Sequence, residues 1–416
     1  MRNDTADPTF EAERRRDGRN VAPDLGGLSG EGSLQRVREP GREARELTRE
    51  EPAREGEAAE GRSYYGLPVL KEPVWKWMIP GYFFAGGLAG ACAVLGAAAQ
   101  IAAGGGTEGL VRRCRVVATA GAAASAALLI ADLGRPARFV YMLRVFRPTS
   151  PMNMGTWILS GFGGLAGVSV LPAVLPRSPR ALARAADLAG VGAGLLGLPL
   201  VGYTGVLVAN TAVPVWQGTR NTLPILFAFS GAVSAGALFQ LWPPRDPSPL
   251  RGRALFSRAR PGERRAGAEV ALRFGRLAKA AELAVSFSLD REAASHAPRV
   301  ARPLHRGVSG AMLQAARGLV AASLVLDLLP GRRRGRPAGA RGAIAGALAL
   351  AGTLLLRFGV VAAGRASARD PHATFEMQRR GRGGAEEARK QGVARMPSLP
   401  GVDATGKESF HAGPGL

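Results

Sequence analysis

The 416-residue sequence is poor in the side chains that ligate metals. It contains only two cysteines, Cys92 and Cys114, and four histidines. Two cysteines that lie far apart are too few for a zinc or an iron–sulfur site. We therefore expect both to be small packing residues, and we expect no metal and no iron–sulfur cluster in this chain.

Charged residues are absent from four long stretches, which are 77–107, 148–176, 188–219 and 221–244. A helix needs about 20 apolar residues to cross a hydrocarbon layer of roughly 30 Å, because its backbone amides must all bond within the segment. A soluble protein would have to bury four such helices that have no polar edge. We therefore predict a multi-pass membrane protein whose fold is an all-α bundle.

The pattern predicts eight transmembrane helices, of which the sixth is doubtful. Arg273, Arg276, Lys279 and Glu282 recur in the sixth segment at helical spacing, so this segment either crosses the membrane or lies at its surface as an amphipathic helix. The predicted spans are residues 79–102, 115–132, 154–175, 187–209, 222–242, 269–289, 306–329 and 342–363.

The histidines also bear on haem, because a b-type haem inside a membrane is normally held by histidines of the spans. All four histidines fall in predicted loops, tails or a span end, so we expect no haem: His296, His305, His372 and His411.

Arginine is unevenly shared between the two faces of the predicted bundle. With eight spans, the connections after the odd-numbered spans carry 18 arginines, and those on the other face carry nine. Arg and Lys in short loops stay preferentially in the cytoplasm. We therefore predict that the first set is cytoplasmic and that both termini lie on the outer face. The net charge of +23 is then a property of the inner loops, so we expect no nucleic-acid partner.

The two ends of the sequence differ from the middle. Residues 1–62 hold 15 acidic residues and 12 arginines, few aromatics and no periodic pattern, which predicts a disordered N-terminal arm. We place the transmembrane domain at residues 63–370 and a flexible C-terminal tail at 371–416.

Several motifs occur in an order that resembles the NrfD/PsrC family, the integral membrane subunit of respiratory oxidoreductases of the polysulfide reductase type. The motifs are YYGLPVLKEPVWKWMIPGYFFAGGLAG (64–90), DLGRPARF leading into SPMNMGTW (150–157), YTGVLVANTAVPVW (203–216) followed by LPILFAFSGAVSAGA (223–237), and GRASARDPHATF (364–375). The resemblance implies eight spans in a cell membrane, both termini outside, and a quinone site near the outer surface. It also implies two partners, a ferredoxin-like iron–sulfur subunit and a molybdopterin-type catalytic subunit.

This resemblance implies a function in electron transport. The chain would pass electrons between a quinone pool, such as menaquinone, and the iron–sulfur subunit on the outer face. With no redox centre of its own, it would be an enzyme only as part of its complex. The alternatives are a secondary transporter or a purely structural membrane anchor, although no inverted repeat is evident.

Tyr203 is the best single candidate for a quinone contact. A phenol inside a membrane must find a hydrogen-bond partner, and that partner could equally be a carbonyl of a neighbouring helix. The family associates the tyrosine of the YTG motif with quinone binding. Further candidates precede the first span, in a stretch suited to the membrane interface: Tyr64, Tyr65, Lys71 and Trp75.

Charged residues inside the spans are the remaining candidates, since such residues are costly in a membrane. We hypothesise an ion pair between Glu282 and Arg317, with Asp327 nearby at the cytoplasmic end of the seventh span. A structural pair is favoured over a proton relay.

The outer connection between the second and third spans carries arginines against the charge rule. Asp132, Arg135, Pro136 and Arg138 lie there, and two explanations stay open. The segment docks a partner subunit, or Asp132 and Arg135 pair with each other while the prolines set the turn.

Overall fold

The computed structural model describes residues 20–22, 27–29, 69–102, 107–175, 178–243, 263–329 and 339–379. The chain divides into two compact units, residues 1–64 and 65–416. In the first unit, strands β1 (Asn20–Ala22) and β2 (Gly27–Ser29) pair antiparallel, with Val21 opposite Leu28. These strands lie in the predicted disordered arm, and the rest of that arm falls outside the described residues.

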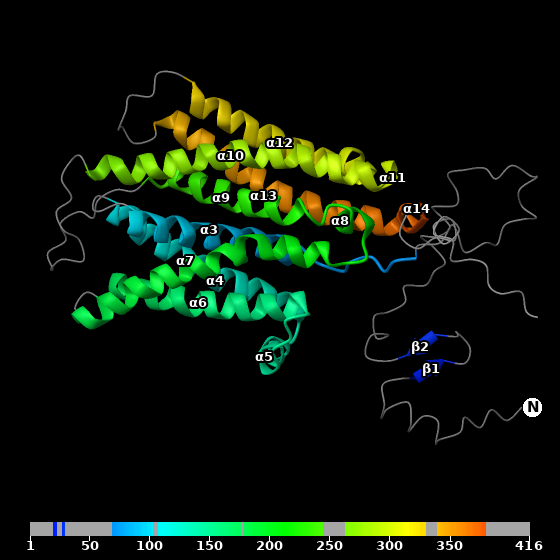
Figure 1. The fold of residues 1–416 in the computed structure, drawn as a ribbon, viewed down its shortest axis with the longest axis horizontal. Coiled ribbons are helices and arrows are strands. Elements are labelled where there is room, and N and C mark those ends of the chain that lie inside the picture. Colours follow the sequence, from blue (N-terminus) through cyan, green and yellow to red (C-terminus); the bar gives the residue numbers. More distant parts are fainter. Residues whose placement is uncertain are drawn as a thin grey trace, which may run out of the picture. The chain divides into compact units, whose positions relative to one another are not determined.

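The second unit is a helical bundle (Figure 1). Its long helices are α3 (Met78–Ala102), α4 (Glu108–Leu133), α6 (Pro151–Val174), α7 (Arg180–Ala209), α9 (Leu223–Leu241), α10 (Glu263–His296), α12 (Gly307–Leu328) and α13 (Ala340–Arg369). Short helices lie in the connections or after the bundle: α5 (Ala137–Arg144), α8 (Pro214–Gln217), α11 (Pro298–His305) and α14 (Pro371–Arg379).

Successive long helices run in opposite directions, so the connections fall at two ends of the bundle (Figure 1). One end, here called the α8 end, carries the short helices α5, α8, α11 and α14 and the residues that precede α3. The helix ends that flank the arginine-rich segments of the sequence lie at the opposite end. α10 brings the chain back from this opposite end to the α8 end, and it lies beside α9 along the way.

Seven helices among the described residues are long and apolar enough to cross a membrane: α3, α4, α6, α7, α9, α12 and α13. They coincide with seven of the eight predicted spans, and most of them extend further at one or both ends than predicted. α10 is not among the seven. The sequence-based doubt about residues 269–289 therefore concerns the charges of this helix and not its length, which is 34 residues.

Small residues let the helices approach closely, as is usual in membrane bundles. A Cβ atom on Gly231 of α9 would lie 2.7 Å from the carbonyl oxygen of Gly87 in α3. A Cβ atom on Gly197 of α7 would lie at the same distance from the carbonyl oxygen of Gly90. Both contacts are backbone to backbone, so α3 is held against α7 and α9 with no side chain between them.

Large apolar side chains are exposed along the outside of the bundle. On α7, Leu188, Leu195 and Leu198 are all more than half exposed. A surface of this kind is unfavourable in water and favourable in a hydrocarbon layer. The exposure pattern therefore agrees with a bundle surrounded by lipid.

The predicted flexible tail begins with structure. Residues 371–379 form α14, in which Ala373 and Thr374 are buried. The carboxylate of Asp370 accepts hydrogen bonds from the backbone N–H groups of His372 and Ala373, at 3.0 and 3.3 Å, and so caps the start of α14. The described part of the predicted tail is thus helical, and residues 380–416 lie outside the described residues.

Candidate functional site

Tyr203 lies near the end of α7, at the α8 end of the bundle, and its side chain is buried. Its ring packs directly on Gly155 of α6, where a Cβ atom would lie 1.7 Å from Cζ and 1.9 Å from the hydroxyl oxygen. The two phenol groups of Tyr203 and Tyr82, the latter on α3, lie within hydrogen-bonding reach of each other. Tyr203 thus joins three helices, and glycine is the residue that leaves room for its ring.

An aromatic cluster continues from this pair. The ring of Tyr82 lies 5.5 Å from that of Phe83, and Phe83 lies 6.1 Å from Trp75 in an edge-to-face arrangement. Trp75 stacks on Trp216 of α8, with ring centroids 5.4 Å apart and planes inclined by 17°. These separations are typical of favourable aromatic pairs. The aromatic cluster therefore links Tyr203 to the segment before α3.

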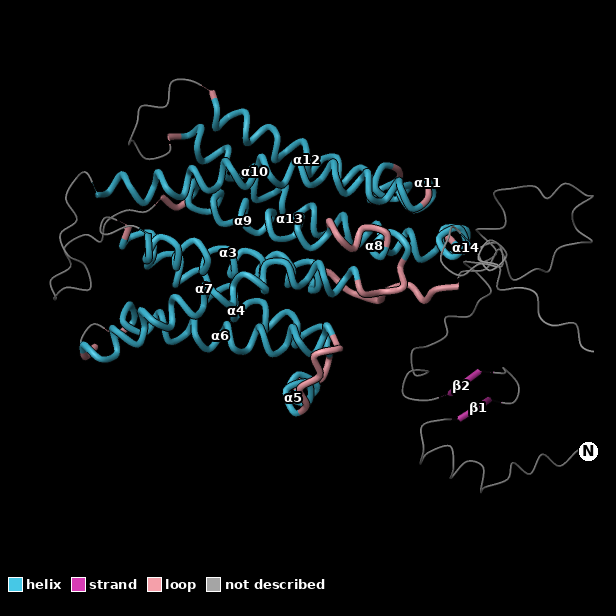
Figure 2. The backbone as a smooth tube through the Cα atoms, in the orientation of Figure 1, coloured by secondary structure: helices cyan, strands magenta, loops and turns pink. Residues whose placement is uncertain are grey.

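Residues 69–77 form an extended strap that crosses the α8 end of the bundle before α3 begins (Figure 2). Glu72 anchors the strap by accepting two hydrogen bonds from Arg369 of α13, each 2.9 Å long. Trp75 is half-buried in the aromatic cluster, whereas Lys71 is exposed. The other predicted contacts, Tyr64 and Tyr65, lie outside the described residues.

Trp216 is fixed from several sides. Its indole Nε1–H donates to the carbonyl of Val360 at 2.9 Å, and its ring occupies the space that a Cβ atom on Gly364 would need. The neighbouring backbone N–H of Val215 donates to the hydroxyl of Ser367. Sequence reasoning did not select Trp216, Tyr82 or Phe83, although all three lie inside motifs that carry the family resemblance.

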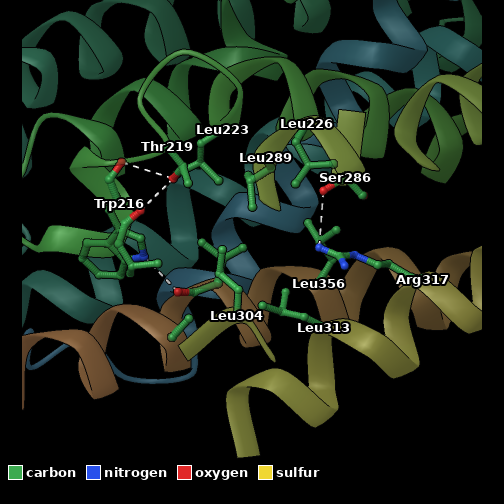
Figure 3. A pocket seen from close by; sticks show the side chains of 13 residues that line it. Trp216, Thr219, Leu223, Leu226, Ser286, Leu289, Leu304, Leu313, Arg317 and Leu356 are labelled. Carbon is green, nitrogen blue, oxygen red and sulfur yellow. Dashed lines mark hydrogen bonds between the residues drawn. The ribbon is translucent and has the colours of Figure 1, made fainter. Parts of the chain in front are cut away.

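A small cavity lies beside Trp216, between α8 and the helices α9 to α13 (Figure 3). Its volume is about 10 Å³, which is the space of a single water molecule. Six leucines line it, and Thr219, Ser286 and Arg317 contribute polar groups. Tyr203 is not among the lining residues, so this cavity is separate from the tyrosine pair.

Arg317 does not pair with Glu282 as hypothesised. Its guanidinium group donates to both carboxylate oxygens of Asp290, at 2.6 and 2.7 Å, and more weakly to the carbonyl of Ser286. Asp290 is two turns further along α10 than Glu282, and His305 lies 3.7 Å from it. The hypothesis was wrong because it treated Glu282 as the nearest acid and overlooked Asp290 just beyond the predicted span.

Asp327 belongs to a second buried group, toward the opposite end of the bundle. Its Oδ2 accepts from Lys279 Nζ at 2.7 Å and from Gln240 Nε2 at 2.8 Å. The side chains of Lys279 and Asp327 are almost fully buried. This group connects α9, α10 and α12, and it explains how α10 can carry charge on a face that packs inside the bundle.

Glu282 faces a third buried charge, Arg357 of α13. The Arg357 guanidinium lies over the ring of Phe227 at 3.8 Å and donates to the Phe227 carbonyl at 2.8 Å. Within the described residues, Glu282 Oε2 and Arg357 Nε and Nη1 have no hydrogen-bond partner. The two side chains therefore attract each other across the core without a direct hydrogen bond.

The segment 132–138 begins at the end of α4 and turns at Gly134, whose φ of 72° favours glycine. Arg138 donates to the carbonyl of Leu133 at 3.2 Å and so closes the turn. Among the described residues, no ion pair joins Asp132 to Arg135. The arginine that stabilises the turn is thus Arg138, while the docking role of Asp132, Arg135, Pro136 and Arg138 stays a prediction.

No group of three or more His, Cys, Asp or Glu side chains is placed to hold a metal ion in the described part of the chain. Cys92 and Cys114 are free thiols, and both are buried.

Comparison with known proteins gives a family match over part of the chain. Residues 69–243 match the sequence model of the family described as polysulphide reductase, NrfD. This range includes the strap and the helices from α3 to α9, and it ends before α10. No curated protein matches the chain.

Proposed function

Because residues 69–243 match the NrfD family of oxidoreductase membrane subunits, we propose that this chain binds a quinone beside Tyr203 and exchanges electrons with an iron–sulfur partner. The observation that carries the proposal is the buried pair of Tyr203 and Tyr82 next to the aromatic cluster. A quinone head group needs a hydrogen-bond donor at its carbonyl and an apolar slot for its ring. The pair would supply the first, and the side chains of the aromatic cluster would supply apolar contacts to the ring.

The quinone accepts two electrons and two protons when it becomes a quinol, and it returns them in the reverse direction. Tyr203 would donate its hydroxyl proton in a hydrogen bond to one carbonyl oxygen, while Tyr82 orients that hydroxyl. Trp75 and Phe83 would flank the ring. Tyr64, Tyr65 and Lys71 stay candidates for contacts from the strap and the residues before it.

Electrons would leave through the partner subunits. With two cysteines and four histidines, the chain is poorly equipped to ligate a redox metal. We therefore propose a ferredoxin-like iron–sulfur subunit, joined to a molybdopterin-type catalytic subunit, at the α8 end of the bundle. The choice of end follows from the location of Tyr203 and from the arginine-rich connections at the other end.

We further propose that α10 is an eighth span and that the α8 end faces outward in the cell membrane. A helix of 34 residues is about 50 Å long, which exceeds the hydrocarbon thickness. Two of the four charges that made the segment doubtful would not face lipid, because Lys279 and Glu282 are buried inside the bundle. An even number of spans then places the two termini of the chain on the same side of the membrane.

The alternative is a secondary transporter, and one observation favours it. The buried charges of α10, α12 and α13 lie outside the range matched to the family, and intramembrane charges often line solute or ion paths. Ion or solute flux by the purified chain, with no retained quinone, would support this alternative.

The proposed function can be tested on the complex purified in mild detergent. We expect a cysteine-rich ferredoxin-like subunit to co-purify, and we expect solvent extraction of the complex to release quinone. Tyr203→Phe removes one hydrogen bond and should weaken quinol turnover about fivefold to tenfold through KM, since such a bond contributes on the order of 1 kcal/mol. The matched control is Tyr141→Phe, because Tyr141 is exposed on α5. Equal KM values in both variants would contradict the role of Tyr203.

A further inference from the structure

Helix α5 is the one helix of eight or more residues, among those with described burial, that buries no residue. It connects α4 to α6 and projects sideways from the bundle at the α8 end (Figure 1). Its position is nevertheless well defined. The Asn153 side chain at the start of α6 donates to the carbonyls of Met142 and Val145, at 2.5 and 2.8 Å, and accepts from the backbone N–H of Arg147. α5 is therefore a fixed part of the surface.

The two faces of α5 differ in exposure, although both carry large apolar side chains. Phe139, Met142 and Leu143 are partly covered by the bundle, and Met142 Sδ lies 3.6 Å from the hydroxyl of Thr156. The opposite face carries the exposed Arg144 together with two large apolar side chains, since Val140 is 63% exposed and Tyr141 is 66% exposed. These values match that of the outward-facing Leu195 of α7, which is 65% exposed. The outer face of α5 thus has the same exposed apolar character as the sides of the spans.

Positive charge surrounds this apolar face. Four arginines lie in the segment 132–147 against a single acidic residue, Asp132. None of their guanidinium groups pairs with a carboxylate among the described residues. The arginines are Arg135, Arg138, Arg144 and Arg147, and Phe146, which is 59% exposed, lies among them. Such a combination of basic and large apolar side chains is typical of helices that lie in the membrane interface.

The position of α5 decides which surface it can contact. The ends of α4 and α6 define the level at which two spans leave the hydrocarbon layer, and α5 lies at that level. Because α5 extends sideways from the bundle, its neighbour there is the surrounding lipid. Long arginine side chains can extend from apolar surroundings to the head groups.

We propose that α5 lies in the membrane interface and binds anionic phospholipid. Val140, Tyr141 and Phe146 insert between the acyl chains, and Arg138 and Arg144 bind the phosphate groups. This assignment competes with the docking of a partner subunit at the same segment. It does not depend on the quinone site, since it requires only that the bundle is embedded in a membrane.

A spin label measures the depth of α5 directly. The label is placed at Val140→Cys, in the full chain with Cys92 and Cys114 replaced by alanine, in nanodiscs of phosphatidylcholine and phosphatidylglycerol. The lipid-facing control is Leu195→Cys, and the water-facing control is Arg220→Cys, an exposed position at the same end of the bundle. We expect oxygen to broaden the Val140→Cys spectrum more than a water-soluble nickel chelate does, as at Leu195→Cys.

Two outcomes would overturn the proposal. Access of the nickel chelate equal to that at Arg220→Cys would place α5 in water. Access to nickel that is lost only when the partner subunits are added would identify α5 as a protein docking surface.

The lipid is tested separately with the double variant Arg138→Gln, Arg144→Gln. Each arginine near an anionic surface contributes enough to strengthen binding about fivefold. We therefore expect the purified double variant to retain at least several-fold less phosphatidylglycerol than the parent in native mass spectrometry, at equal retention of phosphatidylcholine. Equal retention of phosphatidylglycerol by both proteins would contradict the assignment.

Discussion

Gly155 and Tyr203 show how a single residue can determine the form of a site. The ring of Tyr203 lies where any larger residue at position 155 would place its Cβ atom. The backbone of α6 therefore acts as one wall of the tyrosine pair. A second glycine of α6 that contacts no side chain can show how much of the effect of a substitution at Gly155 comes from the Tyr203 ring.

Gly155→Ala should displace Tyr203 and destabilise the protein by about 1–3 kcal/mol, because the side chain must move out of a well-packed position. The matched control is Gly164→Ala on the same helix, where a Cβ atom meets nothing within 4 Å. Thermal unfolding in detergent would compare the two. An equal melting temperature for both variants would show that the Tyr203 ring is not confined as described.

Lys279 and Asp327 are the most completely buried ion pair among the described residues. Lys279→Met leaves the buried Asp327 carboxylate without its lysine, so this variant should destabilise the protein by about 3–5 kcal/mol. The double variant Lys279→Met, Asp327→Leu should recover much of this loss. Reversible unfolding in mixed micelles would measure both. If the double variant were as unstable as the single one, the pair would not be the reason for the loss.

For single residues, the sequence predicts which side chains belong to the candidate site better than it predicts which side chains pair with one another. Tyr203 and Trp75 are selected by motif and position, and the structure links them through Phe83 and Tyr82. The partner of Arg317 was predicted wrongly, since Asp290 and Glu282 lie on the same helix and only the registry of α10 against α12 distinguishes them.

Among the elements, the strap is the one whose position depends on contacts far away in sequence. Its ion pair with Arg369 is partly exposed, so it contributes at most about 1 kcal/mol. The stacking of Trp75 on Trp216 and its contact with Phe83 bury a large apolar surface. The aromatic contacts should therefore hold the strap more strongly than the ion pair does.

Trp75→Ala should accordingly increase hydrogen exchange in residues 69–77 at least tenfold more than Glu72→Gln does, which corresponds to a difference of about 1.4 kcal/mol or more in local stability. Mass spectrometry of deuterated peptides resolves this segment. Comparable exchange in the two variants would show that the ion pair contributes as much as the stacking.

Uncharged runs predict the apolar helices well, because a membrane requires both their length and their composition. α10 illustrates the limit of that rule. Arg273 is exposed and pairs with Glu269 one turn earlier, whereas Lys279 is buried against Asp327. Hydropathy averages these two environments. Only the packing of α9 and α12 around α10 shows which charges are inside.

For the whole bundle, the number of crossings determines the side on which every connection lies. Positions 180 and 220 are separated by one long apolar helix, α7, so a bundle that spans the membrane has them on opposite faces. The match to the family ends at residue 243. The order of the motifs in the sequence predicts that the alternation of the helices continues beyond that residue.

Single cysteines at Arg180 and Arg220, in a background without Cys92 and Cys114, should react differently with a membrane-impermeant maleimide added to intact cells. We expect Arg220→Cys to be labelled and Arg180→Cys to be labelled only after lysis, because the arginine-rich end is retained inside. The reverse pattern would invert the proposed orientation, and labelling of both positions in intact cells would contradict it.

The bond between Glu72 and Arg369 joins positions separated by almost 300 residues. It makes the bundle nearly a closed ring, because the strap before the first long helix meets the end of the last long helix, α13. A circular permutant in which a peptide links the strap to the end of α13 should therefore still form the same bundle. The order in which the helices are synthesised would then not determine the fold of the bundle.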